Sequence, residues 1–247
     1  MDTMAFSTRS HRGKVKRNNQ DYLAIDQERQ ISIIADGVGG KHFGEVASKL
    51  AVDACLQYLQ GLNQEQLEEK GARELSTAIK FANETIITIQ RNEPKYKKMG
   101  TTLTCYWLIK ETLHYAWVGD SRIYLINPQN ETIEKLTHDH TLDQSKIDPT
   151  LSPKLYKRAS SILTQMLGSI LFLKPDSGKR QVKQGDILLS CTDGLSDLVP
   201  DELILEYAIK LINEDEDSIE RYADKLLDRA LDCGGTDNVS FTLARLI

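Results

Sequence analysis

Four aspartates of this 247-residue chain stand beside short apolar runs or glycines where a strand would end or begin. The acids are Asp36 after residues 31–35, Asp120 after 115–119, Asp193 after 187–192, and Asp237 after 234–236. Carboxylates at strand ends can converge, and ionised carboxylates that lie close together repel one another unless a cation binds between them. Hard divalent ions such as Mg²⁺ and Mn²⁺ are the usual occupants of an all-oxygen site. The pattern therefore predicts a centre for metal-assisted hydrolysis.

Residues 36–40, Asp-Gly-Val-Gly-Gly, carry the strongest local signal. Three glycines within four positions permit positive φ angles and a close approach of the backbone to a ligand. A backbone carbonyl can then join the Asp36 carboxylate as a metal ligand, and a helical pattern from Gly44 places a helix N-terminus nearby. A plain glycine-rich turn is the alternative, because Asp-Gly is also a common hairpin sequence. Asp193 and Asp237 have a similar alternative as capped turns.

Two further segments contain residues with possible chemical roles. Lys16 and Arg17 lie just before Asp21, so one segment offers a cation for a phosphate and an acid for a metal shell. A solvated turn explains that segment equally well. Residues 138–140, His-Asp-His, have the composition of a metal cluster, but the chain has only five histidines and we interpret the segment as a structural turn.

The elements that must position these residues follow from the spacing of apolar side chains. Apolar positions recur every three or four residues in four amphipathic helical patterns, at 44–60, 66–90, 200–212 and 218–231. Residues 101–136 change to short β-rich runs typical of an antiparallel meander, and 239–246 form a closing strand. Because helices and strands are segregated along the chain, we expect an α+β layered fold and not a parallel doubly wound one.

Composition limits the domain organisation and the partners. No linker rich in Pro, Gly or Ser divides the chain, so we expect a single domain over residues 1–247. The polar stretch 141–166 contains two prolines and shows only a weak helical period, which indicates an excursion over the surface. The net charge of -5 disfavours nucleic acid and anionic membranes as partners.

The location and the cysteines follow from the same reading. No apolar run is long enough to cross a membrane and residues 1–16 lack a secretory core, so we expect a cytoplasmic protein. The four cysteines are widely separated among apolar neighbours, and we expect buried free thiols at Cys55, Cys105, Cys191 and Cys233. No cysteine has an arginine six positions later, so a thiolate phosphatase loop is absent from the sequence.

Seven segments, taken in order, resemble the metal-dependent protein phosphatases of the type 2C family, especially its short bacterial single-domain members. The likeness covers nearly the whole chain, through residues 13–21, 35–40 with 44–45, 99–102, 119–122, 136–140, 188–195 and 235–238. The resemblance implies a four-layer α/β/β/α sandwich, in which two antiparallel sheets pack face to face and helices flank each. It also implies a binuclear Mn²⁺ or Mg²⁺ centre at one end of the sandwich.

The resemblance also implies a role for the main site residues. By position, Asp36 would bridge both metal ions and the carbonyl of Gly37 would bind one of them. Asp193 and Asp237 would bind the other ion, so Asp36, Asp193 and Asp237 form the catalytic core. Asp120, together with Asp193, matches a third and weaker metal position.

Outside that core, we also expect Asp21 to be an acid of the metal site, and the resemblance makes 141–166 a flap beside the active site. Lys16 stands where the family usually places its phosphate-holding arginine, and Arg17 is adjacent, so either residue can hold the phosphate. The chain also departs from the family at Gln20, where a glutamate is usual, and at Val38, where eukaryotic members carry a histidine.

We therefore expect a Mn²⁺- or Mg²⁺-dependent protein serine/threonine phosphatase that uses a metal-activated water. It would act as a monomer on phosphoproteins in a bacterial cell and reverse a cognate kinase. One alternative is a phosphatase-like module that binds phosphoproteins or another partner without efficient turnover, suggested by Lys16, Gln20 and Val38. A second is an aspartyl-phosphate enzyme with Asp36 as nucleophile, although Val38 fills the place of the second acid in its Asp-x-Asp pattern.

Overall fold

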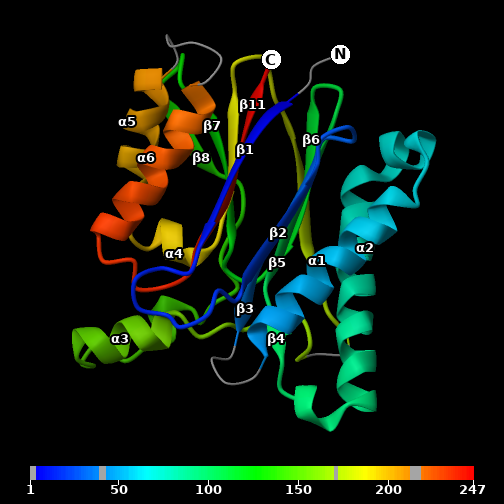
Figure 1. The fold of residues 1–247 in the computed structure, drawn as a ribbon, viewed down its shortest axis with the longest axis vertical. Coiled ribbons are helices and arrows are strands. Elements are labelled where there is room, and N and C mark those ends of the chain that lie inside the picture. Colours follow the sequence, from blue (N-terminus) through cyan, green and yellow to red (C-terminus); the bar gives the residue numbers. More distant parts are fainter. Residues whose placement is uncertain (1–3, 39–42, 170–171, 212–217) are drawn as a thin grey trace.

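Two antiparallel sheets face each other in the computed structural model, and helices cover the outer side of each (Figure 1). The structure describes residues 4–38, 43–169, 172–211 and 218–247. The first sheet has the strand order β1 (Met4–His11), β11 (Val239–Leu246), β10 (Ile187–Cys191), β7 (Arg122–Asn127) and β8 (Thr132–Lys135). The second has the order β2 (Asp21–Asp26), β3 (Ile31–Val38), β5 (Leu103–Ile109), β6 (Thr112–Val118) and β9 (Asp176–Gln181), and the short β4 (Gly100–Thr101) pairs with β3.

The helices form the two outer layers. On the second sheet lie α1 (Gly44–Gln60) and α2 (Gln64–Asn92), which pack against each other. On the first sheet lie α5 (Asp201–Leu211), α6 (Ser218–Asp232) and the short α4 (Asp193–Ser196). The chain also forms α3 (Pro153–Ser160) and two 3-10 turns, η1 (Pro94–Tyr96) and η2 (Gln144–Lys146). The expected α/β/β/α sandwich is confirmed.

Three groups of buried apolar residues hold the four layers together. One fills the space between α1, α2 and the second sheet, and another the space between the first sheet and α4, α5 and α6. The third, which includes Tyr106 and Leu188, lies between the two sheets. Near it, a buried hydrogen bond of 2.8 Å joins Ser32 of β3 to Thr242 of β11. These contacts fix how far apart the strand ends of the two sheets lie.

Several elements differ from the sequence-based expectation. The surface stretch 141–166 contains the helix α3, and β1, β2 and β9 were not predicted. The prediction of buried thiols is wrong for Cys233, which follows the last residue of α6 and is partly exposed, whereas the other three cysteines are buried. Gly39 and Gly40 of the glycine-rich segment, and residue 212 of the third helical pattern, lie outside the described residues. No described helix combines the length and the hydropathy needed to span a membrane.

Candidate active site

The second sheet contributes two carboxylates to one end of the sandwich. Asp21 is the first residue of β2 and lies directly opposite Asp36 near the end of β3. Opposite residues of antiparallel strands point to the same face, so the two carboxyl groups point to the same side of the sheet. The next residue, Gly37, has its backbone so close to other chain segments that a Cβ there would lie 2.2 Å from the carbonyl oxygen of Gly44. Only glycine fits beside Asp36 in this arrangement.

The first sheet contributes two more carboxylates from neighbouring strands. Asp193 follows β10 as the first residue of α4, and Asp237 precedes β11, which pairs with β10. A Cβ at Gly194 would lie 1.8 Å from the carbonyl oxygen of Asn238, so the start of α4 packs directly on the Asp237–Asn238 turn. The absence of a side chain at Gly194 therefore lets Asp193 and Asp237 approach each other.

Asp120 lies on the connection from β6 of the second sheet to β7 of the first. The preceding Gly119 has a φ of 108°, and a Cβ there would lie 2.5 Å from the side chain of Thr102. Arg122, on the other side of Asp120, forms two hydrogen bonds of 2.8 and 3.1 Å with Asp139. The turn therefore directs Asp120 to the cleft and Arg122 to Asp139.

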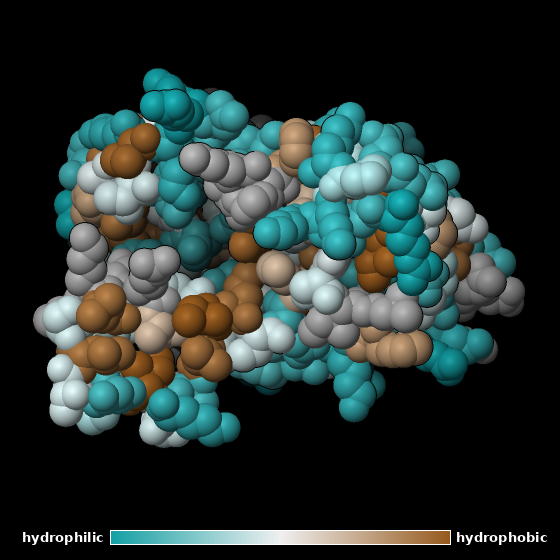
Figure 2. All heavy atoms as spheres, turned by 90° about the horizontal axis from the view of Figure 1, so that it is seen from below, coloured by the Kyte–Doolittle hydropathy of each residue, from teal (hydrophilic) through white to brown (hydrophobic). Residues whose placement is uncertain are grey.

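These residues line an open cleft of about 380 Å³ at one end of the sandwich. Its lining includes four carboxylates and the backbone of Gly37, with residues of the 141–166 excursion on one side; the full lining is Lys16, Gln20, Asp36, Gly37, Val38, Thr102, Asp120, Ser161, Ile162, Leu163, Met166, Asp193, Asp237 and Asn238. Figure 2 views this end of the molecule and shows a hollow with hydrophilic atoms at depth and hydrophobic residues near its border. Acids predicted from four distant segments thus line one cleft.

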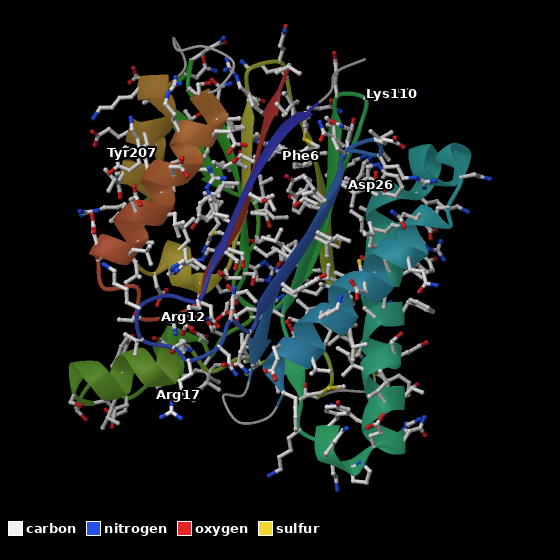
Figure 3. All side chains as sticks on the ribbon, in the orientation of Figure 1. Phe6, Arg12, Arg17, Asp26, Lys110 and Tyr207 are labelled. Atoms are coloured by element: carbon white, nitrogen blue, oxygen red, sulfur yellow. The ribbon has the colours of Figure 1, made fainter. Side chains whose placement is uncertain are left out.

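The two basic candidates lie differently. Lys16 lines the cleft and forms an ion pair with Asp237. Arg17 is exposed, is not part of the cleft lining, and projects outward from the loop between β1 and β2 (Figure 3). Of the two, Lys16 is the cation beside the carboxylates.

Burial, and after it mutual repulsion, raises the pKa values of the carboxylates. Burial, followed by the charges of Asp21 and Asp193, raises the pKa of Asp36 well above its usual range. Burial and the charge of Asp237 raise the pKa of Asp193 to about 6, and burial and the charge of Asp193 raise that of Asp120 to about 7. The pKa of Asp21 is also raised to about 7, mainly by burial. Such shifts show that the negative charges lack full compensation from the protein.

The donor set fits a hard divalent cation. Among the described residues, one oxygen of Asp21 and one of Asp193 are buried without a hydrogen-bond partner. Buried polar atoms are normally paired, and an unpaired carboxylate oxygen beside other carboxylates is a suitable ligand for a cation. The possible metal ligands in the lining are the oxygens of four carboxylates and the backbone carbonyl of Gly37, and oxygen ligands are the kind that Mg²⁺ and Mn²⁺ prefer.

Sequence reasoning missed the polar residues that hold the acids in place. Thr192, which directly follows β10 of one sheet, donates a hydrogen bond of 3.0 Å to Asp21 in β2 of the other. The Asn238 side chain accepts a hydrogen bond from the backbone amide of Gln20 at 2.9 Å. It donates to the backbone carbonyls of Arg12 and Asn18, each at 2.9 Å. Asn238 thereby anchors the loop that carries Lys16. The sequence offered one signal for these two supports, because Thr192 directly precedes Asp193 and Asn238 directly follows Asp237.

The His-Asp-His segment lies outside the cleft lining. His140 is buried, and its ring hydrogen-bonds the backbone amide of Gly119 and the carboxylate of Asp176. His138 is exposed and also pairs with Asp176. The sequence linked neither histidine to Asp176, since 36 residues separate His140 from that acid.

Comparison with known proteins relates this geometry to a family. Residues 9–233 match the family described as Protein phosphatase 2C. The serine/threonine protein phosphatase PstP of Mycobacterium tuberculosis is 32% identical over 251 residues, which cover 99% of this chain and 45% of PstP. The serine/threonine phosphatase stp of Listeria welshimeri is 32% identical over 250 residues, which cover 95% of this chain and 93% of that protein. The chain thus spans less than half the length of PstP.

A solved structure agrees with the sequence comparison. The crystal structure of the catalytic domain of PstP, in complex with two manganese ions, is 30% identical and covers 100% of both chains with a TM-score of 0.83. The similarity therefore includes the whole sandwich as well as the acidic segments. Since the family match extends over residues 9–233, this chain belongs to the protein phosphatase 2C family.

Proposed function

We propose that this chain is a Mn²⁺- or Mg²⁺-dependent phosphatase that hydrolyses phosphoserine and phosphothreonine in proteins. The supporting observation is the cleft in which four carboxylates from both sheets converge, with unpaired oxygens on Asp193 and on the adjacent Asp21. Two relatives that match almost the whole chain are named serine/threonine phosphatases, and one of them binds two manganese ions in a crystal structure.

In this proposal the carboxylates and one backbone carbonyl provide the ligands of two main metal positions and a third, weaker one. Asp36 and the carbonyl of Gly37 would hold one ion, and Asp36 with Asp193 and Asp237 would hold a second. Asp120 with Asp193 would provide a third, weaker position. When bound, such ions neutralise a phosphomonoester dianion and lower the pKa of a water molecule. Asp21 lies opposite Asp36 and accepts a hydrogen bond from Thr192, and it would act as an acid of the metal shell beside these ligands.

The other cleft residues would bind the substrate. The Lys16 ammonium lies beside Asp237, where it can contact a phosphate oxygen as a point charge. The flap residues Ile162, Leu163 and Met166 form an apolar side of the cleft, which would reduce the access of bulk water to a bound phosphoryl group. Positioning and charge neutralisation would therefore be shared between Lys16, the acids and the flap.

The cellular setting completes the proposal. We propose that the domain comprises residues 1–247 with a flap at 141–166, and that it acts as a monomer in the bacterial cytoplasm. Its substrates would be targets of a cognate serine/threonine kinase, and it would reverse that kinase in signal transduction. Nucleic acid and membranes would not be partners, given the net charge of -5.

The proposal is tested with the purified chain, Mn²⁺, p-nitrophenyl phosphate and a phosphothreonine peptide. Asp193→Asn should lower kcat by about 100-fold or more, because it removes a charge that the ions require. Asp232→Asn is the matched control, since its side chain is 76% exposed on α6 and should leave kcat unchanged. A calorimetric Mn²⁺ titration distinguishes the alternative, because metal binding by a wild-type protein without turnover would support a phosphoprotein-binding module and contradict the proposal.

A further inference from the structure

A second group of polar side chains lies beside the cleft. His138, His140 and Asp176 bring two imidazole nitrogens and a carboxylate oxygen within 4.8 Å of one another. Asp176 Oδ2 lies 2.9 Å from His138 Nε2 and 3.1 Å from His140 Nε2. His140 is 5% exposed and its ring stacks on Trp117, whereas His138 is largely exposed. These distances alone are compatible with either a metal site or a hydrogen-bonded relay.

The hydrogen bonds of His140 distinguish the two. Its Nδ1 accepts a hydrogen bond from the backbone amide of Gly119 at 3.1 Å. A neutral imidazole that accepts at Nδ1 carries its hydrogen on Nε2, and that hydrogen is donated to Asp176. A metal-ligating histidine has the opposite polarity, because it binds through a lone pair and donates its other N–H. The surroundings of His140 therefore favour a relay.

This relay acts on the turn that carries Asp120. The backbone amide of His140 also donates to the carbonyl oxygen of Gly119 at 2.9 Å, so His140 bonds both polar groups of that residue. The neighbouring Asp139 binds Arg122 through two hydrogen bonds on the other side of Asp120. The segment 138–140 thus holds the turn on both sides of the carboxylate.

The same residue also contacts the flap. The carbonyl oxygen of His140 accepts a hydrogen bond of 2.7 Å from the amide of Thr164, and Thr141 forms a bridge with Leu163. Leu163 lines the cleft. His140 therefore connects the turn of Asp120, through its ring and backbone amide, with the apolar side of the cleft, through its backbone carbonyl.

We infer that His140 is a positioning residue. With its tautomer fixed between Gly119 and Asp176, it holds the Gly119 peptide and thereby sets the direction of Asp120 toward the ion that Asp120 would bind. The inference rests on the proposed function, because only that function assigns an ion to Asp120. The inference goes beyond the proposed function because it gives a defined role to residues that lie outside the cleft.

Two isosteric variants separate the halves of the relay. In His140→Asn the amide oxygen can replace Nδ1 and accept from Gly119, whereas in His140→Gln the amide reaches toward Asp176 and leaves the Gly119 amide without its acceptor. We expect His140→Asn to stay within about 3-fold of the wild type. We expect His140→Gln to weaken the affinity for the most weakly bound Mn²⁺ by about 10-fold or more in a calorimetric titration, and to lower kcat more than it changes KM. Equal losses in the two variants would overturn the inference.

A double variant tests whether His140 acts through Asp120. If it does, Asp120→Asn combined with His140→Gln loses no more Mn²⁺ affinity or kcat than Asp120→Asn alone, because the positioned group is already gone. Losses that multiply would show an independent structural effect and would overturn the inference. His138→Gln is the matched control on the exposed side of Asp176 and should leave both quantities unchanged.

The tautomer itself is measured without any metal or substrate. In ¹⁵N-labelled metal-free protein, the His140 ring should show a hydrogen on Nε2, and the Gly119 amide should exchange faster in His140→Gln than in His140→Asn. A hydrogen on Nδ1, or stoichiometric Zn²⁺ binding that His138→Gln abolishes, would overturn the inference in favour of a metal site. These measurements stand apart from the proposed function, whose own failure would appear as a wild-type protein without Mn²⁺-dependent hydrolysis.

Discussion

The Lys16 ammonium and the Asp237 carboxylate form an ion pair at the edge of the acidic cleft. Burial acts to lower the pKa of Lys16, but the hydrogen bond to Asp237 and the nearby negative charges raise it above its usual value overall. The lysine therefore stays charged throughout the physiological pH range. A permanent cation beside the cleft carboxylates is suited to a phosphate oxygen.

Lys16→Ala should therefore raise KM for a phosphothreonine peptide by about 10-fold and change kcat less. The substitution removes the positive charge that contacts the phosphate in the ground state and in the transition state alike. Steady-state kinetics with Mn²⁺ checks this expectation. Arg17→Ala is the matched control, since Arg17 is exposed outside the cleft lining. The same rise in KM for Arg17→Ala, with an unchanged KM for Lys16→Ala, would assign the phosphate to Arg17.

Asp21→Asn should stabilise the metal-free protein at neutral pH. The charge of Asp21 raises the pKa of Asp36 directly opposite, so the substitution removes a repulsion between buried acids, and the new amide oxygen can still accept from Thr192. We expect Tm to rise by about 2 to 4 °C without metal and the Tm increase on adding Mn²⁺ to become smaller.

Asp26→Asn, at the far end of the same strand, is the control for that experiment. Asp26 accepts hydrogen bonds from Arg29 and Gln60 and lies away from the cleft, so its substitution should leave the Mn²⁺-induced increase intact. A metal-free Asp21→Asn protein that melts below the wild type would contradict the expected repulsion.

The stability of the metal-free protein should fall as the pH rises from about 4 to 7. In the folded state the pKa of Asp193 is about 6 and those of Asp21 and Asp120 are about 7, against an ordinary value of 3.8. Within this window the folded protein binds more protons than the unfolded chain, so the free energy of unfolding decreases with pH. We expect Tm to be about 5 °C or more lower at pH 7.5 than at pH 5.

Saturating Mn²⁺ should remove this pH trend, because metal binding displaces the protons of these carboxylates and compensates their negative charge. Calorimetric melting curves at several pH values, with chelator and with Mn²⁺, measure both cases. A metal-free Tm that stays constant or rises between pH 5 and 7.5 would show that the acids are not coupled as the cleft geometry requires.

Gly37→Ala should destabilise the fold by about 2 to 3 kcal/mol, because the added methyl group would meet the carbonyl oxygens of Gly44 and Gln20 at 2.2 and 2.6 Å. It should also weaken Mn²⁺ binding, since the backbone beside Asp36 must shift. Gly61→Ala is the matched control, because Gly61 has an ordinary right-handed conformation and its nearest contact would be 3.3 Å. Equal unfolding free energies for the two variants in urea would contradict this account.

Much of the scaffold could be predicted from local sequence patterns. The apolar spacing over 44–60 matches α1 residue for residue, and the second helical pattern falls inside α2. The strand β9, in contrast, has the sequence Asp-Ser-Gly-Lys-Arg-Gln and lies at the edge of the second sheet with mostly exposed side chains. An edge strand of this kind has no apolar alternation, so periodicity could not reveal it.

The acids of the site could also be predicted, but their supports could not. Asp36, Asp193 and Asp237 each stand next to a recognisable strand end, which is a local property. The bond from Thr192 to Asp21 and the pairing of His140 with Asp176 depend on which strands of the two sheets become neighbours. These are tertiary contacts between residues far apart in the sequence, so local patterns in a single sequence cannot predict them.

The pairing of β1 with β11 along their full length places the earliest and latest strands of the sandwich side by side. During synthesis, β1 therefore has to wait until residues 239–246 have left the ribosome before it gains this partner. Because Asp237 stands just before β11, the acidic cleft is complete only once this segment has been synthesised and has paired with β1 and β10. The acidic cleft therefore depends on contacts of very long sequence separation, which close slowly.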